Sequence, residues 1–262
     1  LDPTVSTVYL LCALLMVALT IVTTRRGPVG WNDASFGALV AAFPNSGFMG
    51  VPLLVALLGQ RAAGPAIVAL AIDMIVTSSL CIALSRLDGA NEHGASRAVG
   101  NALKGMLKNP LPWSIFLGCL TTATGLQLWE PARNTVGMLA DGASPVALFT
   151  IGAVLARSQG AAAPAGLGDV PLVTLYKLVL HPLLVLGTGK LAQALGVPLD
   201  GFALTVLVLV AALPSASSIP MLAERFGADA GRIARIVLFG TAASFVSFSA
   251  AVALFVGKNA LP

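Results

Sequence analysis

The feature that most constrains this chain is a succession of apolar runs, each close to the ~20 residues that an α-helix needs to cross a bilayer. Eight such runs lie along the 262 residues, separated by loops that hold nearly all the charged side chains. Only 10% of the residues are charged, whereas a soluble domain carries about 25%. The sequence therefore predicts an all-α, polytopic membrane protein.

A long polar stretch divides the apolar runs into two unequal groups. Three runs precede it, at about 4–24, 34–58 and 63–85, and five follow it, at about 110–128, 134–156, 170–195, 201–223 and 230–256. We expect the stretch 86–109 to be a cytoplasmic loop between an N-terminal part, 1–85, and a C-terminal part, 110–262. Within it, residues 95–108 fit a short interfacial helix.

Loop charges predict the orientation. When the loop after the first run is placed inside and the runs alternate, the inside loops hold ten of the 15 Lys and Arg residues and the outside loops hold four. An excess of Lys and Arg on the cytoplasmic side is the rule for membrane proteins. The remaining cation, Lys177, lies within an apolar run.

Two of the runs are interrupted by proline. Residues 43–52 read Phe-Pro-Asn-Ser-Gly-Phe-Met-Gly-Val-Pro, and residues 213–221 read Leu-Pro-Ser-Ala-Ser-Ser-Ile-Pro-Met. Proline removes a backbone donor and clashes with the preceding turn, and freed backbone groups at membrane depth must be satisfied by protein or a water-filled cavity. Paired broken helices indicate a transporter binding site. Two ordinary proline kinks are the alternative interpretation.

The position of the breaks predicts internal symmetry. The broken run is the second of three before the polar stretch and the fourth of five after it. Aligning the breaks implies two further helices before Leu1, giving ten helices in two repeats of five. Because five is odd, the repeats enter the membrane from opposite sides, as in many secondary transporters.

These motifs, with Pro-Val-Ala-Leu-Phe-Thr-Ile-Gly at 145–152 and Ala-Glu-Arg-Phe-Gly at 223–227, resemble the auxin efflux carrier family, which includes plant PIN proteins and bacterial malonate permeases. The resemblance implies ten helices in two inverted repeats, with two broken helices that cross near the midplane, and eight of the ten present here. It places the protein in a bacterial inner membrane, allows a homodimer, and makes malonate or another small carboxylate an expected substrate.

The breaks supply the candidate substrate-binding residues. The Asn45 amide has both donors and an acceptor, and a helix that restarts after the break would add free N–H groups and partial positive charge. The full predicted set is Pro44, Asn45, Ser46, Ser215, Ser217 and Ser218. Family members often carry asparagine where Ser218 stands, so this shorter side chain would reach a substrate through water. The alternative for Asn45 is an inter-helix hydrogen bond.

Three ionisable residues inside apolar runs are candidates for proton or ion coupling. Asp73 lies about ten residues into its run, where a carboxylate must be paired or hydrated; a structural polar contact is the alternative. Lys177 and His181 share a helix face, being four residues apart. Lys177 could instead snorkel to the interface, and His181 could instead bond a neighbouring helix.

No enzyme, metal or nucleotide motif is present in the sequence, and the small net charge of +4 gives no reason to expect nucleic-acid binding. We therefore expect a secondary transporter of a small organic anion, in contact with the lipid bilayer and without a cofactor other than a coupled proton. An anion channel or a membrane-embedded sensor with the same fold is the alternative.

Overall fold

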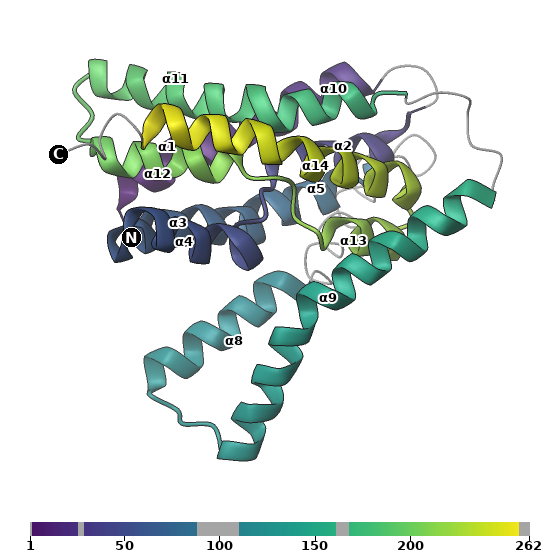
Figure 1. Ribbon diagram of the computed structural model, residues 1–262, viewed down its shortest axis with the longest axis horizontal. Coiled ribbons are helices and arrows are strands. Elements are labelled where there is room, and N and C mark those ends of the chain that lie inside the picture. The colour runs from purple at the N-terminus through teal and green to yellow at the C-terminus, as the bar shows by residue number, and fades with distance from the viewer. Residues whose placement is uncertain (1, 26–28, 88–109, 161–167, 257–262) are drawn as a thin grey trace.

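The computed structural model describes residues 2–25, 29–87, 110–160 and 168–256, and these residues are almost entirely helical (Figure 1). Most of the helices lie side by side in one body, while the hairpin of α8 and α9 extends away from it. The N-terminal part contains α1 (Pro3–Thr24), α2 (Trp31–Ala42), η1 (Ser46–Gly50), α3 (Val51–Leu58), η2 (Gln60–Ala62), α4 (Ala63–Ile72), η3 (Asp73–Thr77) and α5 (Ser78–Leu84).

The C-terminal part follows the same helical pattern. It contains α8 (Pro110–Thr124), α9 (Glu130–Gly160), α10 (Val170–Leu175), η5 (Tyr176–Leu180), α11 (His181–Ala194), α12 (Gly201–Ala212), α13 (Ile219–Arg225) and α14 (Ala230–Phe255). Aspartates start two of the long helices: Asp2 accepts from the Thr4 N–H at 2.9 Å and Asp229 from the Arg232 N–H at 2.8 Å. Such caps satisfy N–H groups that have no partner within the helix.

The first halves of the two broken runs form the centre of the body. Every residue of α2 from Ala34 to Ala42 is buried, and so are nine of the twelve residues of α12. A helix that is apolar all round must be surrounded by other elements. The surrounding helices thus hold the two breaks inside the protein.

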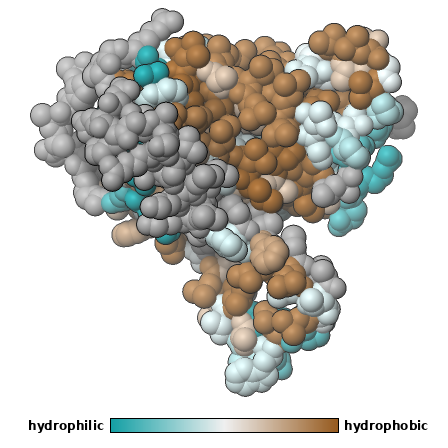
Figure 2. Space-filling view, turned by 180° about the vertical axis from the view of Figure 1, so that it is seen from behind, coloured by the Kyte–Doolittle hydropathy of each residue, from teal (hydrophilic) through white to brown (hydrophobic). Residues whose placement is uncertain are grey.

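Four continuous helices are long and apolar enough to cross a membrane, counting only the described residues: α1, α4–α5 with η2 and η3, α10–α11 with η5, and α14. The broken runs give shorter apolar helices, Ser46–Leu58 and Gly201–Ala212. Figure 2 shows an apolar surface across the middle of the body. The protein is therefore a multi-pass membrane protein, as the composition predicts.

Some predicted elements differ from the structure or lie beyond it. α8 is 15 residues long, and α9 is 31 residues long with Pro145 inside it; neither meets the combined length and composition expected of a span. The spans predicted at 110–128 and 134–156 therefore stay predictions, as do the inverted repeats. The predicted interfacial helix at 95–108 falls outside the described residues.

Basic side chains gather at one end of the body. The Arg25 guanidinium lies 4.1 Å from the centre of the Trp31 ring, and that of Arg86 lies 5.1 Å from the centre of the Phe226 ring. The Asn32 amide donates to the Phe226 carbonyl at 3.2 Å. These contacts bring together the ends of α1, α2, α5 and α13, all of which the alternation of spans assigns to the cytoplasmic side.

Candidate functional site

The two breaks meet inside the body through their backbones. The Asn45 N–H donates to the Pro214 carbonyl at 2.8 Å, and the Ala216 N–H donates to the Phe43 carbonyl at 3.0 Å. Pro44 and Ser215 thereby form an isolated antiparallel β-bridge. Backbone groups freed by the prolines thus satisfy one another, as they must at this depth.

The chain restarts as a helix directly after the first break. The Met49 and Gly50 N–H groups both donate to the Asn45 carbonyl, at 3.2 and 2.9 Å, which opens the π-helical turn η1. α12 ends beside this point, at Ala212. A helix N-terminus, with its partial positive charge, therefore lies at the crossing, where it would favour an anion.

The predicted polar residues at the crossing have different surroundings. The Ser215 hydroxyl donates to the Val40 carbonyl at 2.8 Å and so joins the second break to α2. The hydroxyls of Ser46 and Ser217 are buried and have no hydrogen-bond partner among the described residues. Asn45 and Ser218 are partly exposed, and neither side chain caps the helical turn that follows it. The Ser46 and Ser217 hydroxyls thus keep unused hydrogen-bonding capacity as far as the described residues show.

A second polar cluster lies around Asp73, at the start of the π-helical turn η3. The Tyr9 hydroxyl on α1 donates to one carboxylate oxygen at 2.7 Å, and the Thr77 hydroxyl donates to the other at 3.2 Å. Tyr9 and Asp73 are both 0% exposed. The Tyr9 contact was missed from the sequence, because a tyrosine in an apolar run gives no local sign of its partner.

Lys177 and His181 lie together, as their spacing predicts. The Lys177 ammonium donates to Nδ1 of His181 at 3.1 Å and to the Ala211 carbonyl at 3.0 Å. Both side chains are 0% exposed, so Lys177 does not snorkel. His181 bonds a residue of its own helical segment rather than a neighbouring helix.

The Asp73 and Lys177 groups adjoin each other in the core. The rings of Tyr9 and His181 have centroids 6.2 Å apart. Tyr9 also donates to Asp73, and His181 is bonded to Lys177. The structure thus brings the three predicted coupling residues into one cluster, with Tyr9 at its centre.

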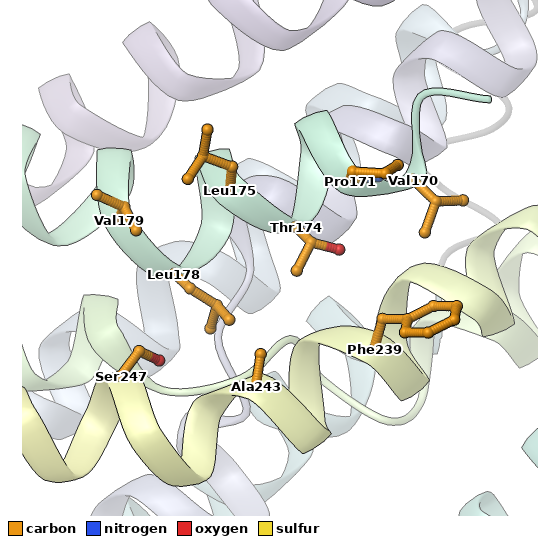
Figure 3. A pocket seen from close by; sticks show the side chains of 9 residues that line it. All are labelled: Val170, Pro171, Thr174, Leu175, Leu178, Val179, Phe239, Ala243 and Ser247. Carbon is orange, nitrogen blue, oxygen red and sulfur yellow. The ribbon is translucent and has the colours of Figure 1, made fainter. Parts of the chain in front are cut away.

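A cavity of about 450 Å³ lies against the second break. Its lining comes from η1, α3, the break and α14, and includes Met49, Leu53, Pro214, Phe245 and Phe248. A separate cavity of about 430 Å³ lies between α10, η5 and α14, where Thr174 and Leu178 face Phe239 and Ala243 (Figure 3). None of the predicted site residues lines either cavity, but the first cavity reaches the second break through Pro214, whereas no residue of a break lines the second cavity.

Paired broken helices that meet at a buried polar point inside an apolar bundle are typical of membrane transporters. The membrane transport protein family model matches residues 3–252, and the chain belongs to that family. This agrees with the resemblance that the break motifs carry.

Two relatives are similar over much of the chain. The "Putative malonate transporter" of Rhizobium meliloti (strain 1021) is 28% identical over 239 residues, which are 91% of this chain and 71% of the relative. The "Uncharacterized transporter YfdV" of Escherichia coli (strain K12) is 27% identical over 198 residues, which are 74% of this chain and 59% of the relative. The chain thus spans less than two thirds of the second relative.

Proposed function

We propose that this protein is a secondary transporter that moves a small organic anion across the inner membrane of a bacterium by alternating access, with the carboxylate bound at the crossing. The observation that carries the proposal is a pair of buried hydroxyls, Ser46 on the first break and Ser217 on the second, which have no hydrogen-bond partner within the described part of the chain. Buried polar groups without partners are rare in native proteins, and a ligand would satisfy both.

Each residue at the crossing has a distinct proposed role. The Asn45 amide and the Ser46 and Ser217 hydroxyls donate to the carboxylate, and Ser218 reaches it through water. Ser215 supports the site, since its hydroxyl already donates to Val40. Pro44 maintains the break in the first helix, because proline has no backbone N–H to donate.

Alternating access requires two parts that move against each other. We infer that the body moves relative to the hairpin of α8 and α9, which extends from it and contacts it mainly through α13 and α14 (Figure 1). The name of the Rhizobium relative makes malonate the first substrate to test. A homodimer is a further expectation.

The test is binding of malonate, succinate, lactate and indole acetate to the purified full-length protein, measured as a shift of Tm. We expect at least one acid to raise the Tm of the wild type and Asn45→Ala to lose that shift. Asn32→Ala is the matched control, because Asn32 lies at the basic end of the body, where it bonds Phe226.

Equal shifts in wild type and Asn45→Ala would place the acid elsewhere and contradict the proposed site. A channel or a sensor is separated from a transporter by uptake into vesicles. Saturable uptake with counterflow supports a transporter, whereas unsaturable flux supports a channel, and binding without flux supports a sensor.

A further inference from the structure

The cluster around Asp73 and Lys177 contains charges that the proposed binding site does not use. Asp73, Lys177 and His181 are each 0% exposed and lie in helices that cross the membrane. Ionisable groups are costly there and usually mark a functional site. No carboxylate forms an ion pair with Lys177 at contact distance among the described residues; its partners are His181 and the Ala211 carbonyl.

The Lys177 contact with Ala211 connects this cluster to the substrate site. Ala211 is the second-last residue of α12, and the break begins two residues later. The final carbonyls of a helix have no partner within it, and a cation at that end is favourable. Lys177 therefore fixes the end of α12 from which the second break, with Ser215 and Ser217, emerges.

We propose that Asp73 takes up one proton with each anion transported, and that Lys177 is the positioning residue that links this event to the crossing. The inference rests on the proposed function and adds that the coupling ion is a proton. A hydronium ion from the bulk water delivers the proton. One O–H bond of hydronium breaks, one O–H bond forms at a carboxylate oxygen of Asp73, and a water molecule is left. Tyr9 and Thr77 remain as partners, because a hydroxyl can accept as well as donate.

Charge balance gives the reason for coupling. With Asp73 ionised and Lys177 protonated, the cluster has no net charge, so an arriving carboxylate adds an uncompensated negative charge in a low-dielectric region. Protonation of Asp73 leaves the Lys177 cation to balance one carboxylate. The anion and the proton thus favour each other's binding, and linkage makes this effect reciprocal.

The other titratable groups around Asp73 are few in the described part of the chain. Tyr9 on α1 contacts Asp73 and the His181 ring, and His181 contacts Lys177. Two buried cysteines, Cys12 on α1 and Cys81 on α5, are the other titratable groups close enough to act on the cluster. Asp73 is the only carboxylate among them. Asp73 is therefore the group whose protonation removes one negative charge when an anion arrives.

The experiment compares two modes of transport in proteoliposomes, with radiolabelled malonate and lactate as probes. Exchange of labelled for unlabelled acid needs no net proton movement, whereas accumulation driven by a pH gradient does. Asp73→Asn should keep exchange within about twofold of wild type and lose accumulation. Asn45→Ala should lose both, which separates failure of the site from failure of the coupling.

Lys177→Met keeps the length of the side chain but removes its charge. We expect it to raise the KM for exchange by roughly tenfold, because a hydrogen bond from a charged donor is lost, and Lys177→Arg to restore part of the affinity. Lys190→Met is the matched control, since Lys190 lies further along α11 and is exposed.

Tyr9→Phe should keep transport and move the pH profile of accumulation to higher pH, because the ionised Asp73 carboxylate loses a hydrogen-bond donor.

Accumulation that persists in Asp73→Asn would overturn the inference, and so would loss of exchange together with accumulation in a folded variant. If Asp73→Asn does not fold, an unchanged pH profile in Tyr9→Phe would overturn it instead. Absence of exchange of either acid by the wild type would overturn the proposed function and this inference with it.

Discussion

At the residue scale, the crossing depends on one close contact that glycine makes possible. A Cβ added at Gly50 would lie 2.5 Å from Cδ1 of Leu213, the residue that precedes Pro214. The turn after the first break therefore packs directly on the start of the second. Gly47, in the same turn, has room for a methyl group, with its nearest neighbour at 3.5 Å.

Gly50→Ala should accordingly separate the two breaks and weaken substrate binding. We expect a loss of about 1–3 kcal/mol, which is typical of overpacking in a dense core, seen as a reduced Tm shift with the acid that binds the wild type. Gly47→Ala is the control and should bind as the wild type does. Equal binding by both variants would show that this contact does not position the site.

Candidate residues could be recognised from the sequence where a polar or charged side chain interrupts an apolar run. Asn45, Asp73 and Lys177 stand out because polar side chains in apolar runs are costly, and Lys177 and His181 meet because helical periodicity fixes their spacing. The partners of Tyr9 and Ser215 were not predictable. Their contacts cross between helices, and no local pattern encodes which distant carbonyl or carboxylate a hydroxyl will reach.

At the element scale, the start of α14 is held by a buried arginine. Arg232 is 8% exposed, and its guanidinium donates to both carboxylate oxygens of Asp169, at 2.8 and 2.5 Å, and to the Asp33 carbonyl at 2.7 Å. The Asp33 side chain accepts from the Asp229 N–H at 2.7 Å. One side chain thus joins α2, the residue before α10, and α14.

Arg232→Lys should lower the stability of the body. A lysine ammonium cannot reproduce the planar, two-pronged contact with Asp169, and the lost charged hydrogen bonds should cost about 1–3 kcal/mol of unfolding free energy. The check is the Tm of the purified protein. Arg225→Lys, at an exposed position on α13, should leave the Tm unchanged; an equal fall in both variants would contradict the assigned role.

The limits of some helices were predictable because their apolar runs end at polar, charged loops. The runs predicted at 4–24 and 230–256 correspond to α1, Pro3–Thr24, and α14, Ala230–Phe255. The π-helical turns η3 and η5 were not predictable, because one extra residue in a turn leaves the apolar composition of the run unchanged. Each of these turns carries a buried ionisable residue, Asp73 or Lys177, and π-helical turns are frequent at functional sites.

At the scale of the whole molecule, charge is divided between two ends. Arg25, Arg86 and Arg232 lie at one end, whereas Arg61 lies over the Phe202 ring, 5.0 Å from its centre, at the start of α12 on the opposite side. The bias of loop charges predicts that the first end is cytoplasmic.

Membrane-impermeant maleimide applied to intact cells should test this orientation. Gln60→Cys should be labelled from outside, and Arg225→Cys, at an exposed position, only after the membrane is opened. The native Cys12 and Cys81 are buried, and Cys119 is replaced by serine for the experiment. Labelling of position 225 in intact cells would contradict the predicted orientation.

The link between the two breaks has a consequence for how such a protein diversifies. Both hydrogen bonds across the crossing join backbone atoms, at residues 43–45 and 214–216. The fold there consequently does not depend on the side chains of Asn45, Ser46 or Ser217. Selection can exchange those side chains and alter which cargo is accepted while the crossing stays assembled, so a single scaffold can give rise to lineages with unrelated substrates.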